Sequence, residues 1–179
     1  IALTLLTASL AAAAYAAPSP GFFDFGKFTP ADSGREFVEV NVTSNLLSIA
    51  ARLTEKSEPE VAEVLRGLQR IRVNVIGLDN SNREEVEKRV KTIQSDLNEQ
   101  GWERVVTAKE KNEDVGVYLK TRGDEAIEGI VVTVFEGKGE AVFINIVGDI
   151  KPEKIAKVGE KLNIDPLKKV GQAIEKETK

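Results

Sequence analysis

The sequence predicts an α+β fold: a two-layer sandwich in which a five-stranded, mostly antiparallel sheet carries helices on one face. Three observations predict it. Apolar residues recur at helical spacing before residue 70 and again over 83–100, alternation with a period of two prevails over 102–150, and a length of 179 residues suits one domain. The expected order of elements is ααβαββββαα.

The first two elements are expected to be short helices that form a hairpin. A helical pattern covers 38–54, with Thr43 or Ser44 as candidate N-cap. Its apolar stripe consists of Leu46, Leu47, Ile49, Ala50 and Leu53. A second helix is expected to begin near Ser57, because Ser57 is a good N-cap and Pro59 is tolerated in a first turn.

A strand over 70–78 and a helix over 83–100 are expected next. Apolar and polar residues alternate in the strand, and Ser81 or Asn82 is the candidate N-cap of the helix. Gly101 closes the helix, since glycine adopts the left-handed conformation freely. The inward side of the helix consists of Val86, Val90, Ile93 and Leu97.

After Gly101 the pattern is that of a meander. Four strands are expected over 102–109, 115–122, 127–136 and 140–150. Gly137-Lys138-Gly139 is a short glycine turn between two apolar runs, which indicates a hairpin. A helix over 152–162 and a last short helix over 165–174 complete the chain.

Alternation in these strands divides the side chains between two faces of the sheet. One face is aliphatic and is expected to lie under the helices; it comprises Val115, Val117, Leu119, Ile130, Val132, Val134, Val142, Ile144 and Ile146. The opposite face is more apolar than is usual for a sheet face exposed to solvent, which predicts a binding surface. Its candidate residues are Tyr118, Lys120, Val131, Phe135, Phe143 and Asn145. Alternatively, the N-terminal Phe-rich segment or the last helix covers this face.

The amino-acid composition excludes several kinds of catalytic and metal-binding site. The chain has no Cys and no His, which excludes thiolate and imidazole nucleophiles, Ser-His-Asp catalysis and Cys/His metal sites. We expect no cofactor and no metal. A net charge of −4 disfavours nucleic acid as a partner. The remaining catalytic candidates are carboxylates at strand ends, Asp114, Asp124 and Asp149.

The first residues read as an export signal. Residues 1–14 are apolar and uncharged, too short to span a bilayer, and Ala14-Tyr15-Ala16 has the small residues of a cleavage site. Residues 1–16 are interpreted as a signal peptide without its basic start, cleaved after Ala16 or Ala17. The alternatives are a retained membrane anchor and a buried helix. Because no Cys follows, no lipid anchor is expected after cleavage, and the protein is expected in the periplasm or exterior of a bacterium.

The rest of the chain divides into three parts. Residues 17–36 form a Phe/Pro/Gly-rich lead, residues 37–175 the α+β domain, and residues 176–179 a frayed tail. The lead contains Phe22, Phe23, Phe25 and Phe28. It is interpreted as a tether whose aromatic side chains pack loosely on the domain, or as an arm that binds a partner.

Residues 37–170 resemble a bacterial family known as domain of unknown function 4252. The resemblance is carried by strand patterns: Ile71-Arg72-Val73 through Ile76-Gly77-Leu78, Gly101-Trp102-Glu103, Val117-Tyr118-Leu119-Lys120 and Phe143-Ile144-Asn145-Ile146-Val147-Gly148-Asp149-Ile150. The resemblance implies an exported protein. Members of that family are often lipoproteins, and this chain differs from them because it has no Cys to carry a lipid. It supplies no catalytic residues.

The function expected from the sequence is a non-catalytic module of the bacterial envelope. Its partner is expected to be an envelope protein or a second copy of the chain, bound at the Tyr118 face. The alternatives are a carboxylate-dependent hydrolase and a sensor or inhibitor of a membrane regulator.

Overall fold

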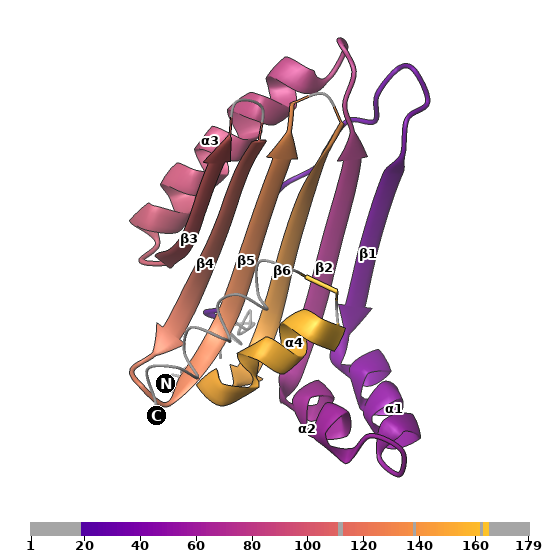
Figure 1. Cartoon of the computed structure of the whole chain (residues 1–179), viewed down its shortest axis with the longest axis vertical. Coiled ribbons are helices and arrows are strands. Elements are labelled where there is room, and N and C mark those ends of the chain that lie inside the picture. The colour runs from indigo at the N-terminus through magenta and orange to yellow at the C-terminus, as the bar shows by residue number, and fades with distance from the viewer. Residues whose placement is uncertain (1–18, 111–112, 138, 162, 165–179) are drawn as a thin grey trace, which may run out of the picture.

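The structure, a computed structural model, describes residues 19–110, 113–137, 139–161 and 163–164 (Figure 1). Its elements are β1 (Phe37–Thr43), α1 (Ser44–Thr54), α2 (Pro59–Gly67), β2 (Leu68–Gly77), α3 (Arg83–Glu99), β3 (Glu103–Glu110), β4 (Glu113–Arg122), β5 (Ala126–Glu136), β6 (Glu140–Ile150), η1 (Pro152–Lys154) and α4 (Ile155–Lys161). The expected signal segment 1–16, last helix 165–174 and tail 176–179 lie outside the described residues. Within the described ranges, no helix is both long enough and apolar enough to cross a bilayer.

The strands form one open antiparallel sheet of six strands in the order β1-β2-β6-β5-β4-β3 (Figure 1). The predicted α+β class and the antiparallel meander are confirmed, but the predicted count of five strands is wrong. The missed strand is β1, which occupies the start of the segment expected to be helical. Val38 and Val40 lie opposite Val75 and Val73 of β2. Pairing with β2 therefore decides the conformation of β1, and the helix begins only at Ser44.

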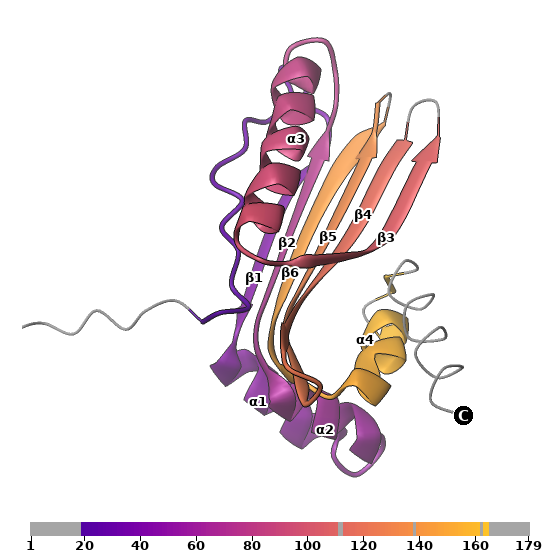
Figure 2. The same ribbon diagram turned by 90° about the vertical axis from the view of Figure 1, so that its left-hand side faces the viewer.

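Helices cover both faces of the sheet, so the predicted two-layer arrangement with helices on one face is wrong (Figure 2). Helices α1, α2 and α4 lie at one end of the aliphatic face. The buried cluster there joins Leu47 of α1 and Ile155 and Val158 of α4 to the sheet. Its sheet members include Val117, Leu119, Ile130, Val132, Ile144 and Ile146. The prediction that these residues lie under helices is confirmed for them.

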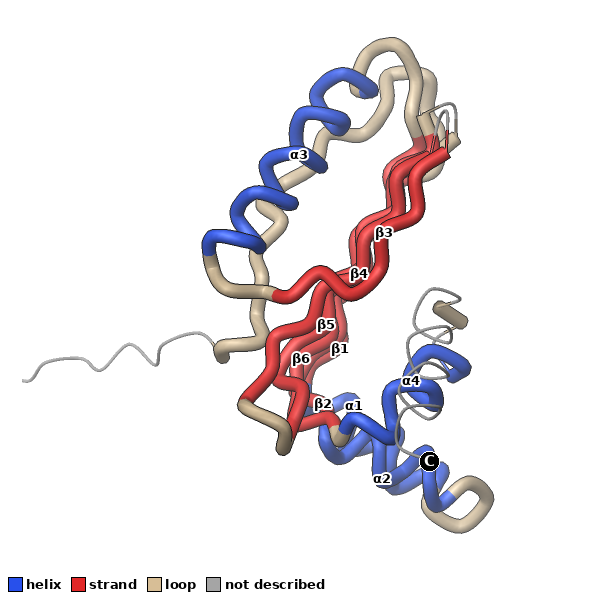
Figure 3. The backbone as a smooth tube through the Cα atoms, turned by 60° about the vertical axis from the view of Figure 1, so that its left-hand side comes forward, coloured by secondary structure: helices blue, strands red, loops and turns tan. Residues whose placement is uncertain are grey.

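Helix α3 packs on the opposite face, together with residues 19–36, which we call the strap (Figures 2 and 3). The inward residues predicted for α3 are all buried: Val86, Val90, Ile93 and Leu97. Gly101, with a φ of 73°, follows the helix as expected. The side chain of Asn82 does not cap the helix; its Oδ1 accepts a hydrogen bond from Asp79 N and its Nδ2 donates to Gly77 O.

Candidate functional site

The sheet face predicted to be a binding surface is a second hydrophobic core. Tyr118, Val131, Phe143 and Asn145 each have 0% of their surface exposed. Phe135 is half-buried against the same cluster. The expectation of an open face is therefore wrong, and the alternative, that the Phe-rich segment covers it, describes the structure. Helix α3 supplies the remainder of the cover.

The side chain of Lys120 makes hydrogen bonds that stabilise the fold. Its Nζ donates hydrogen bonds to Gln100 O at 2.6 Å and to Gly101 O at 3.4 Å. These carbonyls follow the C-terminus of α3, where a cation interacts favourably with the helix dipole. Lys120 therefore joins β4 to the end of α3 and does not line an open surface.

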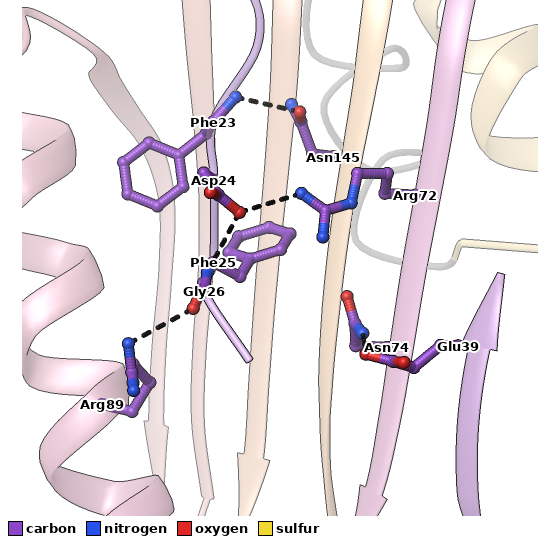
Figure 4. Close-up of polar contacts among 9 residues, drawn as sticks. All are labelled: Phe23, Asp24, Phe25, Gly26, Glu39, Arg72, Asn74, Arg89 and Asn145. Atoms are coloured by element: carbon purple, nitrogen blue, oxygen red, sulfur yellow. Dashed lines mark hydrogen bonds and ion pairs between the residues drawn. The ribbon is translucent and has the colours of Figure 1, made fainter. Parts of the chain in front are cut away.

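Asn145 fixes the strap to the sheet through two hydrogen bonds and makes a third within the sheet; Figure 4 draws the bond with Phe23 N. Its Oδ1 accepts from Phe23 N at 3.0 Å, and its Nδ2 donates to Gly21 O at 3.0 Å and to Ile130 O at 3.2 Å. A strap that runs across a sheet face has main-chain polar groups that need partners once they are buried. The one amide provides partners for a donor and an acceptor of the strap.

The strap contributes aromatic side chains to the core beneath it. Phe23 and Phe25 are 3% and 1% exposed. The Phe25 ring lies 5.6 Å from the Phe143 ring, and the Phe23 ring meets Trp102 edge-on at 6.3 Å, both centroid to centroid. The Phe28 ring stacks on Phe143 at 4.6 Å. The lead is therefore part of the core and not a loosely packed tether.

A pair of arginines from β2 holds the outer side of the strap. Arg72 Nη1 donates to Asp24 Oδ1 at 3.1 Å, which lowers the pKa of the Asp24 carboxyl below its usual value (Figure 4). The guanidinium carbons of Arg70 and Arg72 lie 5.2 Å and 5.7 Å from the centroid of the Phe22 ring, in cation–π contact. Because Asp24 is largely exposed, we assign most of the attachment to Asn145 and the aromatic rings.

The far end of the strap is attached to the turn that precedes α3. Asp79 Oδ2 accepts from Ser33 N at 3.0 Å, and Ser81 Oγ accepts from Asp32 N at 3.1 Å. Asp79 Oδ1 also accepts from Ser81 N at 2.7 Å. Hydrogen bonds from the Ser33 side chain first, and then from the side chain and the main-chain N–H of Ser81, hold the pKa of Asp79 far below its usual value of 3.8. The oxygen-rich turn thus serves as a strap anchor.

This attachment predicts an acid-sensitive contribution to stability. A carboxyl whose pKa is lowered by folding stabilises the folded state above its unfolded pKa, and the contribution is lost as the pH falls through the folded value. We expect Asp79→Asn to lower the free energy of unfolding at pH 7, and the difference from wild type to shrink below about pH 4. Urea unfolding at pH 7, 4 and 2.5 measures this. A difference that stays constant down to pH 2.5 would contradict it.

The candidate catalytic carboxylates do not form an acid–base pair. Asp114, at the start of β4, is bridged by Arg104 at 3.4 Å and Lys109 at 3.5 Å. Asp149 lies near the end of β6 and is bridged by Arg122 at 3.4 Å. Asp124 lies in the exposed turn between β4 and β5.

One pocket does bring Asp149 close to a second acid, Glu63 of α2. This pocket, of about 150 Å³, is also lined by Lys151 and Lys154. Lys154 Nζ lies 3.2 Å from Glu63 Oε2 and lowers the pKa of Glu63. Hydrolysis by two carboxylates needs an acid with a raised pKa, whereas the pKa of Glu63 is lowered. The described residues also contain no group of acids that could hold a metal ion.

Two hydroxyls beneath α3 and the strap lack partners in the described part of the chain. Tyr118 Oη and Thr133 Oγ1 are buried without a hydrogen bond, and both lie against Gly116. Burial raises the pKa of Tyr118. Activation of a hydroxyl as a nucleophile needs an adjacent base. The charged groups that act on Tyr118 are Arg104, whose guanidinium carbon lies 5.4 Å from the ring centroid, and Asp114, which is itself bridged to Arg104.

The apolar residues that are exposed lie elsewhere, mainly on α1. Leu46, Ile49 and Leu53 are 54%, 53% and 78% exposed, and their i, i+3, i+7 spacing places them on one side of the helix. We call them the α1 stripe. Leu47 and Ala51, on the other side of α1, are buried. The sequence pattern identified apolar residues on this helix but placed all of them in a single stripe, so it did not separate this surface from the buried side.

Comparison with known proteins finds one family. A family model described as "Domain of unknown function (DUF4252)" matches residues 32–158, well over half of the chain. No curated protein and no solved structure matches the sequence or fold.

Proposed function

Because the chain belongs to the DUF4252 family, for which no activity is described, we propose its function from its surface: a non-catalytic, exported binding protein of the bacterial envelope. The single observation that carries the proposal is the α1 stripe, three large aliphatic side chains left in water by a helix whose other side is already packed. Soluble proteins expose single aliphatic side chains often, but an aligned set on one helix is typical of a contact surface.

The occupant that we propose for the α1 stripe is another envelope protein with a complementary apolar groove. A membrane surface is less well matched, because helices that lie on lipid surround their apolar side with Lys and Arg. Around α1 the charges are of both signs: Glu55 is bridged to Arg66 at 2.6 Å, and Glu58 is bridged to Lys161. Such a mixed rim around an apolar centre suits a protein interface.

Export is the second part of the proposal. It is supported by the apolar, uncharged run over 1–14 and by the small residues Ala14 and Ala16 at the expected cleavage site. It predicts that the protein recovered from the periplasm or medium begins at Ala17 or Pro18. Mass spectrometry of the purified protein measures this, and an intact N-terminal segment on cytoplasmic protein would contradict it.

The α1 stripe is tested by photo-crosslinking in the producing cells. A photoreactive residue at Ile49 is expected to give one discrete adduct with an envelope protein. The same residue at exposed Thr107 of β3 is the matched control and is expected to give none. The triple variant Leu46→Ser, Leu53→Ser, Ala50→Ser, with the photoreactive residue still at Ile49, is expected to lose the adduct about tenfold or more.

The same triple variant should fold normally. Leu46 and Leu53 are already exposed and Ala50 is half-buried. Because Ala50→Ser adds only one hydroxyl, the three substitutions together are expected to change the free energy of unfolding by less than about 1 kcal/mol. Urea unfolding followed by Trp102 fluorescence measures it. An adduct at Ile49 that survives the substitutions, or adducts of equal yield at Thr107, would contradict the proposed surface.

A further inference from the structure

The two edges of the sheet differ in how they are protected against pairing with another strand. Natural edge strands are blunted by charges, prolines, bulges or a covering segment. β3, at one edge, has a break in register between Arg104 and Val106 and carries Glu103, Arg104 and Lys109. β1, at the other edge, pairs with β2 without a break over all of its 7 residues. It contains no Lys, Arg or Pro, and in the described part of the chain Figure 1 shows no helix or strand beside it on its outer side.

The outward main-chain groups of β1 can be identified. Glu36 O accepts a hydrogen bond from Gly77 N, and Phe37 lies opposite Ile76, so position 36 belongs to a hydrogen-bonded pair. Such pairs alternate along an antiparallel ladder. The N–H and C=O groups of Phe37, Glu39, Asn41 and Thr43 therefore point away from β2. These four residues present an unpaired ladder along the outer edge.

We infer that this edge is a self-association site, at which β1 pairs antiparallel with β1 of a second copy and the two sheets become one. The inferred two-fold axis passes between Val40 and Val40 of the second copy. In this register Glu39 lies opposite Asn41 of the second copy, and Phe37 opposite Thr43. The inference goes beyond the proposed function, because it uses the edge of β1 and not the α1 stripe.

A second copy is the occupant that the sequence of β1 favours, because the strand is its own complement in this register. Val38, Val40 and Val42 lie on one side and meet Val42, Val40 and Val38 of the second copy, and β-branched pairs across strands are stabilising. The only charged residue of β1 is Glu39, and the register places it opposite an amide. Moving the register by two residues in one direction would place Glu39 opposite Glu39, which like charges disfavour.

Disulfide trapping tests the register, because the chain has no Cys and each variant therefore has a single thiol. Val40 would occupy a non-hydrogen-bonded pair with Cα atoms about 4.5 Å apart, within the range that a disulfide spans. We expect Val40→Cys to form a covalent dimer at least about tenfold faster under mild oxidant than Leu53→Cys. Leu53 is the more exposed of the two positions, 78% against 40%, so exposure alone predicts the opposite order.

Substitution of Asn41 supplies an independent test with two opposite outcomes. Lys at position 41 would lie opposite Glu39 of the second copy at two symmetric places, and Glu there would place like charges together. We expect Asn41→Lys to tighten the dimer and Asn41→Glu to weaken it, each about tenfold in dissociation constant by analytical ultracentrifugation. Within one chain Asn41 lies opposite Arg72, so the effects on folding have the reverse sign and cannot imitate the result.

Three results would overturn the inference: a wild-type protein that stays monomeric at the highest soluble concentration, equal trapping rates for Val40→Cys and Leu53→Cys, or Asn41 variants that shift the dissociation constant equally. A monomer that binds an unrelated strand peptide at β1 would also overturn it. The proposed function is judged separately: a monomer that still gives the Ile49 adduct removes only the self-association site, and a dimer without that adduct removes only the α1 stripe.

Discussion

Replacement of Asn145 by alanine is expected to lower the free energy of unfolding by about 3 kcal/mol. Asn145 is completely buried, and its removal leaves Phe23 N, Gly21 O and Ile130 O without the partners they have in the folded state. Each buried polar group left unpaired costs about 1–3 kcal/mol. Partial release of the strap offsets some of this cost by giving two of these groups access to water. Urea unfolding at pH 7 measures the change.

Asn74→Ala is the matched control for this prediction. Asn74 is a buried asparagine on the same face of the sheet, 3% exposed, but its one hydrogen bond goes to the Glu39 side chain and its own Oδ1 has no partner. Its loss is therefore expected to cost about 1 kcal/mol or less. Equal losses for the two variants would show that Asn145 does not fix the strap.

Phe25→Ala is expected to destabilise the protein by about 4 kcal/mol, as usual for the removal of a buried aromatic ring. Phe25 is 1% exposed and lies between Phe23 and Phe143, so its removal leaves a cavity between the strap and the sheet. Phe23 also contacts Trp102, the only tryptophan of the chain. We therefore expect the folded-state fluorescence of the variant to shift towards that of a solvated indole.

Phe22→Ala provides the comparison within the same segment. Phe22 is only half-buried, and its ring lies against the guanidinium groups of Arg70 and Arg72. We expect this variant to lose about 1 kcal/mol and to keep the fluorescence of the wild type. If Phe25→Ala is as mild as Phe22→Ala, the strap is a loosely packed tether, as the sequence alone suggested.

Both predictions have the same consequence for function. Residues 19–36 close the Tyr118 face, so loss of the strap would expose a large apolar area and promote aggregation. A binding surface inferred from variants with a damaged strap would therefore be an artefact of unfolding. This is why the tests of the α1 stripe and of the β1 edge use positions that are exposed in the intact protein.

Much of the fold follows from local sequence patterns. The period of two after Gly101 reflects strands with distinct faces, and the four apolar residues of α3 reflect a helix packed on one side. Residues four positions apart also form ion pairs on the surface of α3, Glu84–Lys88 and Glu87–Lys91, each at 2.8 Å. These features depend on neighbours in the chain, which the sequence displays directly.

Local sequence patterns could not predict the strand β1 or the exposure of the α1 stripe. Val38, Val40 and Val42 precede a helical run without a turn residue between them, and only pairing with β2, about 30 residues later, makes them a strand. Leu46, Ile49 and Leu53 are as apolar as Leu47. Which of them is buried depends on where α2 and the sheet lie, not on the periodicity of α1.

By itself, then, the sequence determined the α+β class, the antiparallel order of the last strands, the extent and inward residues of α3 and the family of the chain, because each rests on local periodicity or on residue identity. The tertiary structure alone decided that the Tyr118 face of the sheet is buried. A sheet with two apolar faces can be covered on either side, and the outcome depends on contacts between residues more than 100 positions apart, such as those of Phe23 with Asn145. Those contacts convert the predicted surface into a core and leave the α1 stripe and the β1 edge as the surfaces available to partners.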